Sequence, residues 1–228
     1  PRGDAGRGPL KRGLGIGVNT WGGAGHDSTC RCNIHADGTV ELELGSQDLG
    51  TGTRTIIMQT ACESLGLKMG EVKVKIGDTN FPPSGTSGGS TTVGGVSSST
   101  RKATLNALAK LFDEVAASLG APADQLEAVD GKIQVKGNPA KSLTWKAACQ
   151  KLGVKSMSET GQNVPREAPR EGLNTGGVGG VQIADVSVDV ETGVVRMNRL
   201  IAVQDCGNII NPRTAESQVF GACIMSIC

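Results

Sequence analysis

The sequence predicts an α+β fold of two layers, in which helices pack on mixed β-sheets that contain long hairpins. Several short stretches alternate apolar and polar residues with period two, which is typical of strands with one buried face. Other stretches repeat apolar residues every three or four positions, as amphipathic helices do. Some strands are separated by tight turns and others are followed by a glycine-rich loop and a helix, so hairpins and strand–loop–helix units should both occur.

Residues 1–11 form a polar lead-in, and residues 12–120 are expected to form a first β/α unit. In that unit the turn at residues 36–38 predicts a hairpin. The first expected helix ends at Gly66, a residue that readily adopts the left-handed conformation after a helix. The expected elements are, in order, strands at residues 28–35, 39–44 and 72–76 and helices at residues 54–65 and 98–119.

Residues 121–175 are expected to be an insertion and linker, with a small hairpin around Asp130-Gly131, a short helix from about Thr144 to Leu152 and extended chain beyond residue 156. Residues 176–228 should form a long hairpin and then a helix of a second unit. Asn211-Pro212 predicts the start of that helix, with Asn as N-cap and Pro at the first helical position. Its apolar face consists of Val219, Phe220, Cys223, Ile224 and Ile227, and we expect either the hairpin or a partner chain to cover the first four of these.

Composition argues against several functions. Lys and Arg number 23 against 22 Asp and Glu, and aromatic residues make up 2% of the chain, so we expect no nucleic-acid binding. No apolar stretch reaches the ~18 residues of a membrane span. The odd number of cysteines, seven, and the absence of a CxxC motif favour a reducing compartment, hence the cytoplasm, with the periplasm as the alternative. Cys30, Cys32, His26 and His35 lack metal-ligand spacing and are expected to be structural.

Two glycine-rich loops are the candidate functional features. The segments GSQDLGTGT (residues 45–53) and GTSGGSTT (residues 85–92) each precede a predicted helix, whose first N–H groups can bind an anion. Neither loop has the lysine of a P-loop, and the GxG-type segments elsewhere lie in the wrong context for a Rossmann fingerprint. The sequence therefore predicts one large ligand that carries phosphate, and the alternative is that the glycines serve only tight turns and packing.

Three blocks of the sequence are distinctive in combination: GSQDLGTGTRTIIMQTACESLGL, VKVKIGDTNFPPSGTSGGSTTVGG and VSVDVETGVVRMNRLIAVQDCGNIINPRTAESQVFG. In this order they resemble the molybdenum-binding subunit of the xanthine dehydrogenase and aldehyde oxidase family. The resemblance implies binding of molybdopterin with molybdenum, often in its cytosine dinucleotide form. By the same resemblance, Gly50, Thr51 and Gly52 approach the molybdenum centre, whereas the pterin and its phosphate lie against Gly88, Gly89, Ser90 and Thr91.

The resemblance also implies oxidation of an aldehyde or N-heterocycle with water as the oxygen source. Electrons would leave through iron–sulfur clusters and FAD on partner subunits or domains, and the rest of the large subunit would be a further partner. Thr51 and Met225 stand where some members have Gln, and Ser217 replaces a usual Gly. The family's general-base glutamate would lie beyond Cys228, so no catalytic residue is assigned and the isolated chain is expected to be inactive. The alternative is a non-catalytic structural or interaction module that keeps the scaffold without metal.

Overall fold

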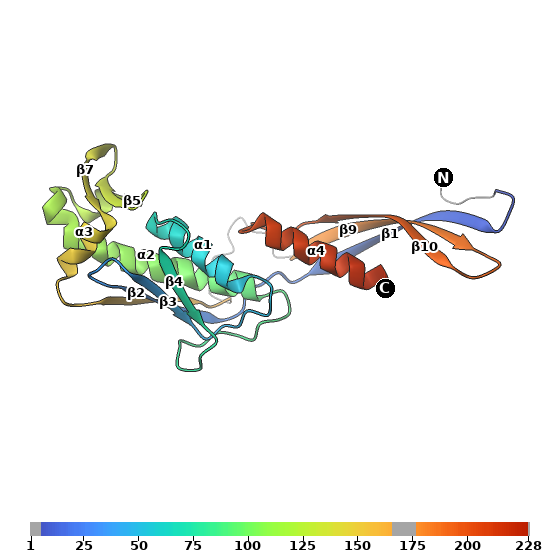
Figure 1. Ribbon diagram of the computed structural model, residues 1–228, viewed down its shortest axis with the longest axis horizontal. Helices are drawn as coiled ribbons and strands as arrows, with labels where there is room; N and C mark the ends of the chain where they lie inside the picture. Colours follow the sequence, from blue (N-terminus) through green and yellow to red (C-terminus); the bar gives the residue numbers. More distant parts are fainter. Residues whose placement is uncertain (1–5, 166–176, 228) are drawn as a thin grey trace. The chain divides into compact units, whose positions relative to one another are not determined.

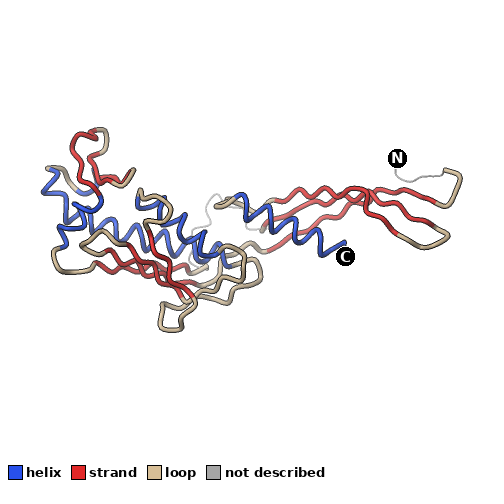
Figure 2. Tube along the Cα trace, in the orientation of Figure 1, coloured by secondary structure: helices blue, strands red, loops and turns tan. Residues whose placement is uncertain are grey.

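A computed structural model describes residues 6–165 and 177–227 (Figures 1 and 2). The described residues form two compact units. The larger unit holds residues 24–165, and the smaller unit joins residues 6–23 to residues 177–227. The combination of helices with mixed and antiparallel sheets confirms the predicted α+β class.

A four-stranded sheet in the order β4-β3-β2-β8 is the centre of the larger unit. The predicted hairpin is confirmed, because β2 (Ser28–Ile34) pairs antiparallel with β3 (Val40–Leu44) across the turn at residues 36–38. Next to β3 lies β4 (Val72–Ile76), which runs parallel to it after the crossover through α1 (Thr53–Leu65). The sheet is completed by β8 (Met157–Asn163), antiparallel to β2.

One face of this sheet is covered by α1 and by α2 (Thr92–Leu119), as Figure 1 shows. The alternation in β2 and β3 decides which side chains enter that core, because successive residues point to opposite faces of the sheet. The fully buried aliphatic and thiol side chains on these strands are Cys30, Cys32, Ile34, Val40, Leu42 and Leu44.

Charged side chains occupy the opposite face of the sheet. Arg31 pairs with Glu43 at 3.1 Å, and Lys75 pairs with Glu41 at 2.8 Å. These are cross-strand neighbours of opposite charge, which stabilise a sheet modestly when they remain in contact with solvent. The polar half of the alternating pattern thus faces away from the helices.

The helix α2 lies against the backbone of β8 at Gly161. A Cβ atom at this position would be 2.1 Å from the backbone nitrogen of Ala103 and 2.5 Å from the carbonyl oxygen of Ser99. Asn106 Nδ2 donates to the carbonyl oxygen of Thr160 at 2.9 Å and strengthens the same contact. The absence of a side chain at residue 161 is therefore what lets helix and strand approach so closely.

A second sheet of the larger unit packs near the C-terminal half of α2, in the order β5-β6-β7. Its strands are Leu126–Val129, Lys132–Val135 and Asn138–Thr144, preceded by a short 3-10 turn at Ala123–Gln125. The predicted turn at Asp130-Gly131 is present, with φ angles of 50° and 71°. The predicted short helix is also present, as α3 (Trp145–Cys149) and a 3-10 turn over Gln150–Leu152.

The smaller unit is a three-stranded sheet in the order β1-β9-β10 with one helix. The predicted hairpin is formed by β9 (Val178–Asp189) and β10 (Val195–Gln204), and α4 spans Pro212–Ile227. Asn211 is the N-cap as predicted, since its Oδ1 accepts a hydrogen bond from Thr214 N at 3.2 Å. None of the described helices combines the length and hydrophobicity needed to cross a membrane.

The structure differs from the sequence-based expectation at several elements. Residues 10–21, expected partly in a polar lead-in and partly in the first β/α unit, form β1 and pair along their whole length with β9. Residues 157–163, expected only to be extended, complete the four-stranded sheet as β8. The second long helix begins at Thr92 rather than near residue 98.

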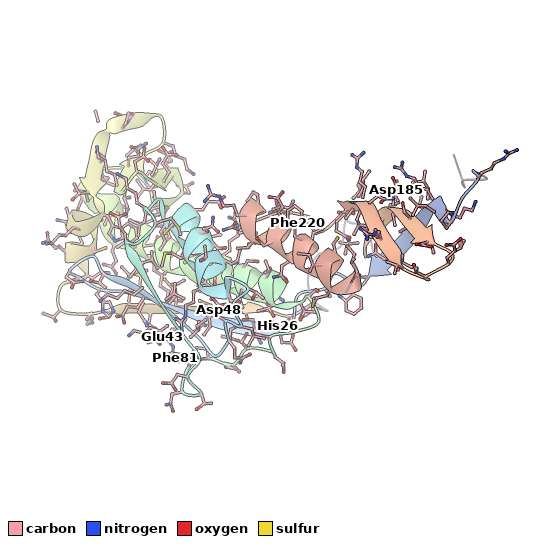
Figure 3. All side chains as sticks on the ribbon, turned by 45° about the vertical axis from the view of Figure 1, so that its right-hand side comes forward. His26, Glu43, Asp48, Phe81, Asp185 and Phe220 are labelled. Carbon is pink, nitrogen blue, oxygen red and sulfur yellow. The ribbon has the colours of Figure 1, made fainter. Side chains whose placement is uncertain are left out.

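Most apolar residues of α4 are exposed. Phe220 and Ile224 are each 60% exposed, and none of the described residues of this helix is buried (Figure 3 labels Phe220). The strands between residues 181 and 203 therefore leave Phe220 and Ile224 uncovered, whereas Val219 and Cys223 of the same face are half-buried. Cover by a partner chain stays a prediction.

Candidate cofactor-binding site

The two glycine-rich loops lie side by side at one edge of the four-stranded sheet. The first loop (residues 45–52) follows β3 and the second loop (residues 77–91) follows β4. Because β3 and β4 are parallel neighbours, both loops leave the same edge of the sheet. Two hydrogen bonds join them directly, from Ser87 N to Gln47 Oε1 at 3.1 Å and from Ser87 Oγ to the Gln47 carbonyl oxygen at 2.9 Å. The two loops are therefore in direct contact at Gln47 and Ser87.

The first loop is organised by the carboxylate of Asp48. Its oxygens accept hydrogen bonds from the backbone N–H groups of Gly50 at 3.0 Å, Gly52 at 3.2 Å and Arg54 at 3.1 Å. Gly50 and Gly52 have φ angles of 91° and 86°, a left-handed conformation that glycine adopts at little cost. Burial raises the pKa of Asp48, but these N–H groups together outweigh it and hold the pKa below its usual value.

This arrangement corrects one expectation from the sequence. The N–H groups at the start of α1 were expected to be free for an anion, yet the side chain of Asp48 already occupies three of the amides around it. A carboxylate at a helix N-terminus also offsets the positive end of the helix dipole. We therefore expect Gly50, Thr51 and Gly52 to offer exposed backbone and a hydroxyl to a ligand rather than a phosphate site.

The second loop leads to a helix N-terminus without such a cap. The N-cap residue of α2, Thr91, makes no capping hydrogen bond with its side chain, and its hydroxyl donates to the carbonyl oxygen of Gly88 at 2.9 Å. The first turn of α2 contains no acidic residue. The first N–H groups of a helix have no partner within the helix, so this terminus retains its attraction for an anion.

The space around the second loop also suits a bound group. A Cβ at Gly88 would meet no atom within 4 Å, and one at Gly89 would meet only the Thr91 methyl at 3.9 Å. Gly88, Gly89 and Ser90 are exposed, and Ser90 has a φ angle of 59°. Small exposed residues, positive φ angles and an uncapped helix N-terminus fit a phosphate-bearing cofactor such as molybdopterin.

Other glycines near the site serve packing, as the alternative interpretation of the sequence proposed. A Cβ at Gly25 would lie 2.5 Å from the backbone carbon of Gly94. A Cβ at Gly95 would lie 2.2 Å from Cδ2 of His26. The pair Gly94-Gly95 therefore lets the segment before β2 contact the first turn of α2.

His26 is a residue of the site that the sequence analysis treated only as structural. Its backbone N–H donates to the Thr91 carbonyl oxygen at 3.1 Å, and its ring nitrogens contact Thr86 and Ser84 of the second loop. Figure 3 shows His26 and Asp48 on the larger unit. No spacing in the sequence marks His26, since its partners lie 58 or more residues away.

Comparison with known proteins assigns the family. The sequence profile of the molybdopterin cofactor-binding domain family matches residues 2–228. The chain belongs to this family. The resemblance to the xanthine dehydrogenase and aldehyde oxidase molybdenum subunits, seen in three blocks of sequence, is confirmed.

Similar proteins include molybdenum-binding subunits of oxidoreductases. The chain is 34% identical over 200 residues to the aldehyde oxidoreductase molybdenum-binding subunit PaoC of Escherichia coli K12, covering 88% of this chain and 26% of that protein. It is 27% identical over 241 residues to the carbon monoxide dehydrogenase large chain of Afipia carboxidovorans, covering 94% and 28%. The chain thus spans between a quarter and a third of the length of these relatives.

A solved structure has the same fold. Quinoline 2-oxidoreductase from Pseudomonas putida 86 superposes with a TM-score of 0.83 at 22% identity, covering 93% of this chain and 29% of that one. The fold described above is therefore shared with an enzyme chain that is much longer than this sequence.

Proposed function

We propose that this chain is part of a molybdenum hydroxylase and binds the molybdopterin cofactor through its two glycine-rich loops. The observation that carries the proposal is the uncapped N-terminus of α2, which follows the open loop at Gly88–Thr91. This loop is tied to the first loop, with Gly50–Gly52, by the two hydrogen bonds of Ser87. Family membership supports the same ligand.

Each loop has a distinct task in this proposal. The second loop and the first turn of α2 bind a phosphate of the cofactor through N–H groups and the hydroxyl of Ser90. The first loop, held rigid by Asp48, places the exposed Thr51 and its neighbouring glycines beside the bound group. When bound, the cofactor supplies the redox and oxygen-transfer chemistry, and the protein contributes placement and electrostatics.

The relatives support more specific proposals about the whole enzyme. They include the molybdenum-binding subunits of an aldehyde oxidoreductase and a xanthine dehydrogenase and the large chain of a carbon monoxide dehydrogenase, so we propose an aldehyde or N-heterocycle as substrate. We also propose the cytosine dinucleotide form of the cofactor, and the rest of the large subunit together with iron–sulfur and FAD-bearing partners. The described cysteines are all free, which supports the cytoplasm as the compartment, with the periplasm as the alternative.

A non-catalytic module that keeps the scaffold without metal is the second candidate. It is favoured by the glycines that serve only packing, among them Gly25, Gly95 and Gly161. No residue of this sequence matches the family's general-base glutamate, so we propose that even with cofactor bound this chain alone turns over no aldehyde or purine. Cofactor content, rather than turnover, therefore distinguishes the two candidates.

The test measures molybdenum by mass spectrometry and pterin by fluorescence after oxidation, on the full chain purified from cells that make the cofactor. The variant is Gly88→Asp, because the open space at Gly88 accepts the side chain while the added negative charge repels a phosphate. The control is Val154→Asp, which adds the same charge at a fully exposed residue shortly before β8.

We expect the wild type and Val154→Asp to carry molybdenum and pterin. Gly88→Asp should carry at least about tenfold less of both, because its negative charge repels the negatively charged phosphate at the N-terminus of α2. Wild-type protein without either component would refute the proposal and leave the non-catalytic module. Equal loss in both variants would show that the second loop has no specific role.

A further inference from the structure

We propose that His26 is a positioning residue: it fixes the second loop and the first turn of α2 in the conformation that binds the phosphate of the cofactor. The identity of the ligand in this inference rests on the proposed function. The role of His26 in fixing the loop rests on the contacts of His26 alone. His26 lies two residues before the start of β2, at the end of the strand that is nearest to the second loop.

One residue holds the loop at three separate points. The backbone N–H of His26 donates to the Thr91 carbonyl oxygen at 3.1 Å, which fixes the N-cap of α2. The ring atom Nδ1 lies 3.3 Å from the Thr86 carbonyl oxygen, and Nε2 lies 3.2 Å from Ser84 Oγ. The carbonyl oxygen of His26 in turn accepts from Asn163 Nδ2 at 2.8 Å, so the residue itself is anchored to the last position of β8.

The hydrogen-bond partners of the imidazole determine which ring nitrogen donates and which accepts. A carbonyl oxygen can only accept, so Nδ1 carries the hydrogen that is directed at Thr86. In the neutral ring Nε2 is then the acceptor, and the hydroxyl of Ser84 donates to it. Both ring nitrogens are thereby engaged with the loop, so His26 acts on a ligand through the loop and not by contact.

A line of hydroxyl groups continues from Ser84 into the core. Ser84 Oγ lies 3.1 Å from Ser28 Oγ, which lies 3.1 Å from Ser99 Oγ. Ser28 and Ser99 are buried, on β2 and α2 respectively, and Ser99 also contacts the Val96 carbonyl oxygen at 3.1 Å. Because the Ser99 hydroxyl has one hydrogen, it shares that hydrogen between Ser28 Oγ and the Val96 carbonyl oxygen. These buried hydroxyl contacts connect the loop to the same helix whose N-terminus it precedes.

The imidazole ring of His26 is packed closely between two glycines. A Cβ at Gly85 would lie 2.8 Å from Cγ of His26, and a Cβ at Gly95 would lie 2.2 Å from Cδ2. The imidazole therefore fills the space between the loop and the first turn of α2. Any side chain at residue 85 or residue 95 would clash with the ring, so both positions require glycine.

The test uses the full chain with the variants His26→Ala and His26→Gln. His35→Ala is the matched control, because His35 is the other histidine of the chain and lies at the opposite end of β2, bonded to Ser156 Oγ at 2.8 Å. The first readout is hydrogen–deuterium exchange of the amides of residues 84–95 without ligand. The second is the affinity for inorganic pyrophosphate, a probe of the phosphate site, followed by ³¹P NMR.

We expect His26→Ala to exchange at least about tenfold faster over residues 84–95 and to bind pyrophosphate about tenfold more weakly, the effect of losing one to two hydrogen bonds. Exchange in β3 and β4 should not change. His26→Gln should recover part of both effects, because its side-chain oxygen can accept from Ser84. His35→Ala should match the wild type in both readouts.

Other results would refute either the positioning role of His26 or the phosphate site itself. Wild-type exchange in His26→Ala, or faster exchange spread equally over the whole sheet, would overturn the positioning role. Unchanged pyrophosphate affinity in a variant whose loop exchanges faster would also overturn it, while leaving the proposed function intact. A wild type that binds no pyrophosphate would instead refute the phosphate site, even if His26→Ala loosens the loop. If His26→Ala does not fold, His26→Gln supplies the same comparison.

Discussion

Replacing Gly161 by alanine tests the contact that joins α2 to the four-stranded sheet. The new Cβ would lie 2.1 Å from Ala103 N, 2.5 Å from Ser99 O and 2.7 Å from Lys102 C. All three atoms belong to the backbone of α2, so no side-chain rotation can relieve the clash. Carbon atoms in contact are ordinarily ~3.5 Å apart or more, and the helix must therefore move by about 1 Å or more.

The cost follows from what that movement disturbs. Overpacking of a well-packed core typically costs ~1–3 kcal/mol, and a clash with backbone belongs at the upper end of that range. The hydrogen bonds from Lys102 Nζ to Gln162 O at 2.8 Å and from Asn106 Nδ2 to Thr160 O at 2.9 Å cross the same contact and would lengthen. We expect Gly161→Ala to lower the free energy of unfolding by ~3 kcal/mol.

Urea unfolding followed by circular dichroism measures this difference. Gly88→Ala is the control, because its Cβ would meet nothing within 4 Å and its free energy of unfolding should stay within ~0.5 kcal/mol of the wild type. Failure of Gly161→Ala to fold would agree with a large loss. A free energy of unfolding equal to that of Gly88→Ala would refute the direct packing of α2 on β8.

Three further predictions concern titratable side chains. Asp48→Asn should lower the free energy of unfolding at pH 7 by ~1 kcal/mol in urea titrations, because the amide NH2 group cannot accept the backbone hydrogen bonds that one carboxylate oxygen accepts. The folded-state pKa of Asp48 is lowered, so this contribution is present above the usual value near 3.8 and is lost as the pH falls through the folded-state pKa. Arg12→Gln should raise the pKa of Asp185, which the Arg12 hydrogen bond lowers to about 2, towards 3.8, and carboxyl NMR would follow this shift. Iodoacetamide should label exposed Cys206 in the native protein and spare Cys30, whose pKa burial raises to about 12, as peptide mass spectrometry would show.

Local signals in the sequence were sufficient for many of the elements. The alternation in residues 28–34 and 40–44 marks two strands and the side chains that they bury, because adjacent residues of a strand face opposite ways. Gly66 and Asn211 mark helix ends correctly, because capping depends on residues close in the chain.

Elements that depend on distant partners could not be predicted in this way. Residues 157–163 are polar and contain a glycine, yet they form a strand because the free edge of β2 supplies their hydrogen bonds. In β1 glycines alternate with exposed apolar residues, and pairing with β9 more than 150 residues away makes it a strand. The helix α2 includes Gly94 and Gly95, which are poor helix formers, because the segment at Gly25 and His26 packs against them.

The candidate site divides in the same way. The sequence by itself determined that two glycine-rich loops precede helices, since glycine spacing and helix starts are local properties. Only the tertiary structure decided that Asp48 occupies the amides of the first loop, that the N-terminus of α2 is left uncapped, and that His26 holds the second loop. Hydrogen bonds and close contacts depend on distance in space, and residues 26 and 84 become neighbours only when the chain between them has folded.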